Sequence, residues 1–199
     1  MGLRSWFKEL KISLGAVLPL AVLLCGIYPL TVWVLDQGLF PRRSNGSLEK
    51  RQGQVIGSSL LSQAFTEPRY FHPRPSAAGQ GHDAARSGAS NLGPTSKTLA
   101  EMVRARVDAY RRENGLSPRQ LVPADAVTAS ASGLDPHISV TNAFFQAGRV
   151  ARARGSAEAD VRRLVERLKE GRTLGLLGEP RVNVLLLNLA LDGVRDGGK

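Results

Sequence analysis

A long apolar segment lies near the start of the chain, and the remainder mixes apolar and polar residues and is rich in loops. Residues 12–35 contain no Asp, Glu, Lys, Arg or His. As a helix rising 1.5 Å per residue they would reach about 36 Å, more than the roughly 30 Å hydrocarbon core of a bilayer. The pattern predicts one transmembrane helix over 12–35 behind a short tail, 1–11. Pro19 and Pro29 each remove a backbone donor, so we expect a kinked helix that packs against other helices.

A cleaved signal peptide is the alternative for the same segment. The apolar run is longer than the usual 7 to 15 residues, and no Ala-x-Ala-like site follows it before Asn45. Retention in the membrane is therefore favoured. The charges beside the segment leave its orientation open, because three basic residues lie on each side within fifteen residues of it. They are Arg4, Lys8 and Lys11 before it and Arg42, Arg43 and Lys50 after it.

The remainder of the chain is long enough for one compact domain. Residues 36–51 are polar and predict a juxtamembrane tether, 52–192 predict a soluble α+β domain, and 193–199 a C-terminal tail. Within the domain, residues 66–98 contain four Pro and four Gly and no helical or alternating pattern. Such long loops are unusual in compact domains. Tyr70 and its aromatic neighbours predict that this loop is ordered and held against the core.

Three helices have clear signals in the second half of the domain. Thr98 and Glu101 form a capping box at the start of the first, which Gly115 ends. The second is expected over 139–153. The third is expected to begin at Ser156 as its N-cap and to end at Gly171.

Two further segments are more ambiguous. Residues 127–132 are small and predict a short strand. Residues 182–191 are apolar almost all round, so periodicity does not separate a buried strand from a buried helix, although Pro180 at a first helical position favours a helix.

Charge and composition narrow the functional classes. The chain carries 27 Lys and Arg against 17 Asp and Glu, a net charge of +10. Arginines crowd residues 149–181 and suit anionic lipid or nucleic acid, but no aromatic residue interleaves them as a base-stacking surface requires, so we expect no nucleic-acid partner. The single cysteine, Cys25, excludes an intramolecular disulfide, and the three scattered histidines predict no metal site.

Candidate catalytic residues are few. Pro94 and Ser96 occupy positions before Lys97 where a phosphate-binding loop needs a backbone donor and a glycine, so this is no phosphate loop. Ser132, Asp135 and His137 offer the residue types of a hydrolase triad within six positions, but without a nucleophile elbow. A membrane-tethered periplasmic hydrolase using Ser132 and His137 therefore stays the alternative function.

Several stretches have a particular order of residues that local structural rules do not explain. They are Gly57-Ser58-Ser59-Leu60-Leu61 with Gln63 and Phe65; Tyr70-Phe71-His72-Pro73-Arg74-Pro75-Ser76-Ala77; Ser90-Asn91-Leu92-Gly93-Pro94; Val122-Pro123; 127–139; Gln146; 149–155; 177–184; and 187–192. In this order, behind one span, they closely resemble the C subunit of the Kdp potassium-transporting ATPase, over nearly the whole chain. Ala89, Ser62 and Val140 depart from that family's usual Gly, Gly and Pro.

The resemblance implies a small bacterial inner-membrane subunit with a single span and no catalysis of its own. Its N-terminus would be cytoplasmic and its domain periplasmic. Its partners would be a potassium-binding pore subunit, a P-type ATP-hydrolysing subunit, a small one-helix subunit and membrane lipid, with potassium as the transported ion.

The resemblance also implies a chaperone-like role that raises the affinity of the pump for ATP. Candidate nucleotide or partner contacts are Gln146 and Arg149 together with Ser130, Ser132, Asp135 and His137. Ser130 and Ser132, with the backbone amides around Gly133, could hold a phosphate oxygen, but satisfaction of the turn explains these residues equally well. A domain outside the cytoplasm would influence cytosolic ATP only indirectly.

Overall fold

The structure is a computed structural model that describes residues 2–193, and the chain divides into two compact units between Ser47 and Leu48. The first unit consists of helix α1 (Leu3–Ala21), a π-helical turn η1 (Val22–Ile27), helix α2 (Tyr28–Leu39) and the short helix α3 (Pro41–Ser44). By length and composition the continuous helix Arg4–Leu39 can cross a membrane. It extends past the predicted 12–35 on both sides, into the predicted tail and tether.

The π-helical turn lies between the two prolines of this helix. Its last bond runs from the amide of Tyr28 to the carbonyl of Leu23, one residue wider than an α-helical bond. Local π geometry is one way in which a membrane helix satisfies carbonyls that a proline leaves without a donor. One turn further along, the hydroxyl of Thr31 also donates to the Ile27 carbonyl, at 2.8 Å.

The second unit begins with an antiparallel hairpin of β1 (Leu48–Arg51) and β2 (Gln54–Ser58). Gln52 and Gly53 connect the strands, and both have positive φ, as a two-residue hairpin turn of this twist requires. Strand β1 therefore takes up residues that the sequence assigned to the tether. All of the predicted C-terminal tail except Gly193 lies outside the described residues.

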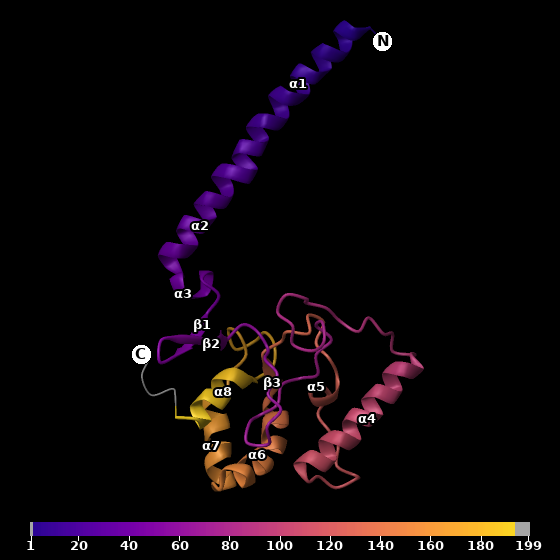
Figure 1. Ribbon diagram of the computed structural model, residues 1–199, viewed down its shortest axis with the longest axis vertical. Helices are drawn as coiled ribbons and strands as arrows, with labels where there is room; N and C mark the ends of the chain where they lie inside the picture. The colour runs from indigo at the N-terminus through magenta and orange to yellow at the C-terminus, as the bar shows by residue number, and fades with distance from the viewer. Residues whose placement is uncertain (1, 194–199) are drawn as a thin grey trace. The chain divides into compact units, whose positions relative to one another are not determined.

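The core of the second unit forms around helix α6 (Val140–Arg154), which packs against α7 (Glu158–Leu168), while α8 (Val184–Leu191) packs against α7 (Figure 1). A second antiparallel pair, β3 (His137–Ser139) and β4 (Arg181–Asn183), lies at the start of α6 and α8. Ser139 caps α6 by accepting a bond from the amide of Asn142, and Gly155 ends it in the left-handed region. The predicted second helix and the α+β class are confirmed.

Two helix starts differ from the prediction by one or two residues. Helix α4 (Lys97–Asn114) is capped by Ser96, whose hydroxyl accepts from the amide of Leu99, and not by Thr98. Helix α7 follows Ala157 and not Ser156, because the amide of Ser156 completes the end of α6 by bonding the carbonyl of Ala151. Gly115 ends α4 as expected.

The two ambiguous segments are now assigned. The predicted strand 127–132 is wrong: Val127 closes a short helix, α5 (Ala124–Val127), and residues 128–132 form bends and irregular backbone. The Thr128 hydroxyl bonds the Ala124 carbonyl, and the Ser132 carbonyl accepts from the Gly88 amide of the long loop, so neither group pairs with a strand. The helix predicted within 182–191 is confirmed as α8. Pro180 is not its first residue, because β4 intervenes and Asn183 caps α8 through the amide of Leu186.

Residues 59–96, between β2 and α4, form no helix or strand, yet the loop is held against the core. Phe71 is fully buried in the core cluster. Its amide donates to the side chain of Asn188 on α8 at 2.8 Å, and the same side chain donates back to the Phe71 carbonyl at 3.0 Å. The expected ordered loop is confirmed.

A glycine lies where this loop contacts residues 129–136. At Gly133, with a φ of 68°, an added Cβ would lie 2.7 Å from both the Ala78 amide nitrogen and the Gly88 carbonyl oxygen. Gly155 has a similar φ of 65° but open space around it.

We predict that Gly133→Ala destabilises the soluble unit by about 2–5 kcal/mol, from left-handed strain plus steric overlap, and that Gly155→Ala costs only the strain, about 1–2 kcal/mol. Denaturant unfolding of the full chain in detergent, followed by circular dichroism, measures both. Equal losses in the two variants would contradict the close packing at Gly133.

Candidate functional site

The structure separates the six residues singled out from the sequence into two clusters. Gln146 and Arg149 belong to a buried polar network on α6, whereas Ser130, Ser132, Asp135 and His137 lie in or just after the loop that precedes β3. Loop residues 72–74 join the clusters, because His72 bonds Gln146 and Arg74 bonds Asp135.

Every polar atom of the Gln146 amide is used within the domain. Its Oε1 accepts from the amide of His72 at 2.7 Å and from Nη2 of Arg149 at 2.8 Å. Its Nε2 donates to the His72 carbonyl at 3.1 Å and to Oδ1 of Asn142 at 2.9 Å. An amide offers two donors and an acceptor oxygen with two lone pairs, so this side chain is saturated.

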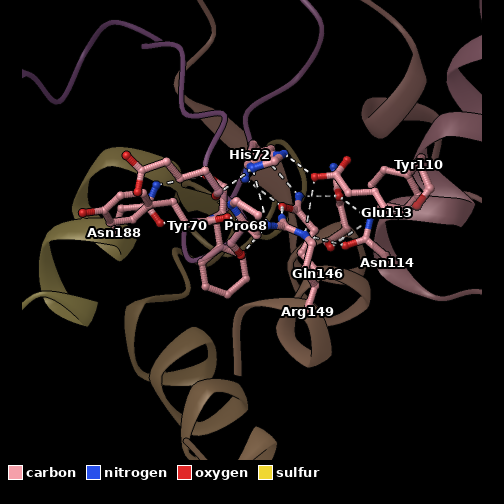
Figure 2. A network of polar contacts seen from close by, with 12 residues as sticks. Pro68, Tyr70, His72, Tyr110, Glu113, Asn114, Gln146, Arg149 and Asn188 are labelled. Carbon is pink, nitrogen blue, oxygen red and sulfur yellow. Dashed lines mark hydrogen bonds and ion pairs between the residues drawn. The ribbon is translucent and has the colours of Figure 1, made fainter. Parts of the chain in front are cut away.

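Arg149 is buried beside Gln146 and donates to the backbone of the loop at residues 68–70 (Figure 2). Its Nη1 donates to the carbonyls of Pro68 at 2.6 Å and Tyr70 at 3.0 Å, and its Nε donates to Oδ1 of Asn114 at 3.1 Å. Burial lowers the pKa of Arg149, and the nearby carboxylate of Glu113 opposes this effect. The guanidinium therefore holds the two ends of one loop segment.

Glu113, at the end of α4, is one of two carboxylates in this network, because Oδ2 of Asp125 also accepts from Nδ2 of Asn142 at 2.9 Å. Its Oε1 lies 2.7 Å from Nδ1 of His72 and 3.5 Å from Nε of Arg149. The hydrogen bond with His72 lowers the pKa of Glu113, with partial burial opposing the shift. One carboxylate thus ties α4 to both the loop and α6.

Asp135 is the centre of the second cluster. Its Oδ2 accepts from Nη1 of Arg74 at 2.9 Å, and its Oδ1 accepts from the amide of His137 at 3.0 Å. Burial alone would raise the pKa of Asp135, but the bonds from His137 and Arg74 outweigh it and lower the pKa to about 2. His137 in turn lies between Asp135 and Glu170, with its Nε2 3.5 Å from Oε2 of Glu170.

Ser130 and Ser132 satisfy the turn around Gly133. The Ser132 hydroxyl accepts from the Leu134 amide at 3.1 Å, and the Ser130 carbonyl accepts from the Gly133 amide at 3.2 Å. Both amides considered for a phosphate oxygen therefore have partners. Among the described residues no hydrogen bond joins Ser132 to His137, and the alternative hydrolase gains no support from this geometry.

The sequence analysis missed the partners that make the network. Glu113, Asn114 and Asn142 gave no usable signal, because polar residues on amphipathic helices are ordinary. Asn188 did give a signal, because it interrupts the otherwise apolar run of residues 184–191. A polar residue inside such a run is either exposed or hydrogen-bonded in the core, and Asn188 is the latter.

A cavity of about 290 Å³ lies beside the network, bordered by His72, Arg74, Tyr110, Glu113 and Gln146 among others. Burial raises the pKa of the Tyr110 phenol, which donates to Oδ1 of Asn142 at 2.8 Å. Within residues 2–193 no group of three His, Cys, Asp or Glu side chains is placed to hold a metal ion.

Fold and site together define a class of protein: one helix of membrane-spanning length, joined to an α+β domain whose buried polar residues hold its own loops. Comparison with known proteins identifies the family. Residues 10–193 match the family model described as KdpC: K+-transporting ATPase, c chain. The chain belongs to this family, which confirms the resemblance found from the sequence.

The chain is similar to several proteins named potassium-transporting ATPase KdpC subunit. The one from Nitratidesulfovibrio vulgaris is 56% identical over 186 residues, covering 93% of this chain and 94% of the relative. The Sorangium cellulosum protein is 55% identical over 190 residues, with 94% and 98% covered. The Mycobacterium tuberculosis protein is 53% identical over 185 residues, with 93% and 98% covered.

The network predicts a large difference between two arginines that both lie within helices, Arg149 on α6 and Arg163 on α7. Arg149→Met leaves the carbonyls of Pro68 and Tyr70 and Oδ1 of Asn114 without this donor, while Glu113 keeps its contact with His72. We expect a loss of about 3–5 kcal/mol in unfolding free energy, because several acceptors lose their partner at once. Arg163→Met removes an exposed arginine whose one ion pair among the described residues is with Asp160, and we expect a change within about 0.5 kcal/mol. Denaturant unfolding compares them. A loss below about 1 kcal/mol for Arg149→Met would show that the network does not stabilise the domain.

Proposed function

We propose that this chain is a non-catalytic accessory subunit of a potassium-transporting P-type ATPase in the bacterial inner membrane. It assembles with a potassium-binding pore subunit, an ATP-hydrolysing subunit and a small one-helix subunit, and it stabilises their complex. Potassium is the ion that the complex transports. The observation that carries the proposal is the match to KdpC subunits over more than nine-tenths of the chain, including the membrane-spanning helix.

The state of the polar residues supports a role without catalysis. Gln146 and Arg149 use their polar atoms on the loop and on each other, and Asp135 is paired with Arg74 and His137. A general base or nucleophile needs a reacting partner within hydrogen-bond reach. Side chains that are saturated by their own domain are suited to rigidity and not to turnover.

The same saturation favours an indirect effect on ATP. We propose that the chain raises the affinity of the pump for ATP through assembly, by favouring the conformation of the ATP-hydrolysing subunit that binds nucleotide, and not through contact of Gln146 or Arg149 with ATP. Such an effect requires only that the chain bind one conformation of its partner more tightly than another.

We predict that the complex depends on this chain in two measurable ways. Affinity purification of the tagged full chain in mild detergent, from cells that produce all subunits, recovers the pore and ATP-hydrolysing subunits. ATPase assays on complexes prepared with and without the chain show a KM for ATP several-fold lower when the chain is present. Recovery of the tagged chain by itself would refute assembly, and an unchanged KM would refute the effect on ATP.

We propose that the N-terminus is cytoplasmic and the domain periplasmic, as the family resemblance implies. Two exposed residues can report this orientation: Ser5 in the first turn of the membrane-spanning helix, and Leu121 in a loop of the second unit. In a Cys25→Ser background, Leu121→Cys is expected to react with a membrane-impermeant maleimide in cells with a permeable outer membrane. Ser5→Cys is expected to react only after the inner membrane is opened. The reverse pattern would place the domain in the cytoplasm.

A further inference from the structure

An exposed apolar loop in the second unit has no partner among the described residues. It covers residues 172–179, between α7 and β4, and is called the leucine loop below. Leu174 and Leu176 are 87% and 80% exposed, and Leu177 is 63% exposed. Single exposed leucines are ordinary on a protein surface, but three within four residues at one tip are not.

The leucine loop is rigid at its tip. The amide of Thr173 donates to the carbonyl of Leu177 at 2.9 Å, and the amide of Leu177 donates back to the carbonyl of Thr173 at 2.9 Å. Leu174 has a φ of 55°, a left-handed conformation that is costly for a leucine. The backbone is thus held in one strained shape that presents leucine side chains to solvent. Strain of this kind occurs where a binding surface is formed in advance.

The base of the loop is electrically neutral. Arg172 makes a two-pronged contact with Glu179, both bonds at 2.9 Å, and Arg181 bonds Glu170 at 3.1 Å. Loops that insert into the surface of a membrane usually combine apolar residues with free basic or interfacial aromatic residues. The leucine loop has neither, since its only cation is paired. Its chemistry therefore fits an apolar pocket on a protein with an uncharged rim.

Size decides what kind of protein partner this is. A stable interface takes roughly 800 Å² from each side and about 20–30 residues. An eight-residue loop is too small for that, so by itself it would not hold any protein that meets it in solution. A weak contact suffices where a second attachment already holds the two proteins together, because attachment raises their effective concentration. The membrane-spanning helix supplies such an attachment, but only to a protein in the same membrane.

We propose that the leucine loop docks into an apolar pocket on the extramembrane surface of another subunit of the same ATPase. Leu174 and Leu176 are its anchors, and the paired charges at the base meet the rim of the pocket. This rests on the proposed function, because it needs a membrane-embedded partner. It adds the surface by which the soluble domain is held.

Site-specific photo-cross-linking tests the contact in the assembled complex. A photoreactive residue replaces Leu176 in the full chain, in cells that produce every subunit. In the matched control it replaces Leu121, which is 82% exposed in another loop. We expect one protein adduct from position 176, containing another ATPase subunit, and at least tenfold less of it from position 121. Adducts to a second copy of this chain, to lipid alone, or equally from both positions would overturn the proposal.

A polar variant provides a second measurement that does not depend on cross-linking. Leu174→Asn with Leu176→Ser removes the anchors, and asparagine tolerates the left-handed conformation at position 174. We expect the recovery of partner subunits to fall at least tenfold in detergent wash, with the denaturant midpoint of the chain unchanged. Leu121→Ser is expected to recover partners as the wild-type chain does. Full recovery by the double variant would overturn the docking role.

The two experiments separate this inference from the proposed function. If the wild-type chain recovers the other subunits but position 176 forms no adduct with them, assembly holds and the leucine loop is excluded. If the wild-type chain recovers no other subunit, both proposals fail.

Discussion

The fold of the domain depends on two buried side-chain amides, those of Asn188 and Gln146. They pair with the backbone of the loop at residues 71 and 72, as a neighbouring strand would in a sheet. Asn188 bonds both the amide and the carbonyl of Phe71, and Gln146 bonds both the amide and the carbonyl of His72. A chain entering the interior without a strand partner leaves backbone groups unpaired, at a cost of about 1–3 kcal/mol each. Two helix side chains remove that cost at consecutive residues. The buried Phe71 ring is possible only because its backbone is satisfied in this way.

This constraint explains where the chemically reactive residues of the domain are used. Arg149 reaches the loop at Tyr70, one residue before the amide-paired segment, and Glu113 lies 3.5 Å from the charge that Arg149 brings into the interior. Removing a buried guanidinium that bonds several backbone carbonyls is far more costly than removing an exposed one. Gln146 and Arg149 have the residue types of a binding site, but their hydrogen bonds hold the loop in place.

The sequence was most informative where a local rule decided the structure. Helix α6 could be predicted because Ser139 and Gly155 mark its ends, and the membrane-spanning helix because charge is absent from a long run. Prediction failed where neighbouring elements compete for one residue: Ser156 completes α6 and does not cap α7, and Asn183 rather than Pro180 starts α8.

The candidate site was predictable only in its residue types. Gln146 and Arg149 were recognisable through family resemblance, but their contacts with residues 68–72 join positions more than seventy residues apart. No local pattern in one sequence encodes such a pairing. Asp135 and His137 are closer in sequence, and there the turn chemistry could be anticipated, because an aspartate two residues before an amide often accepts from it.

A rigid domain and a membrane-spanning helix together allow recognition by small contacts. Ordering a flexible loop on binding costs free energy, and the strained, doubly bonded tip at Thr173 and Leu177 has already incurred that cost during folding. The leucine loop is supported by α7 and β4, which flank it. Both pack against α6, the helix that carries Gln146 and Arg149, so the internal network keeps these supports in place. A helix confined to the bilayer then removes most of the translational freedom that a soluble partner would lose. Under these conditions a few exposed leucines are enough to hold a domain to a membrane-embedded partner, although they would not hold two proteins that meet in solution.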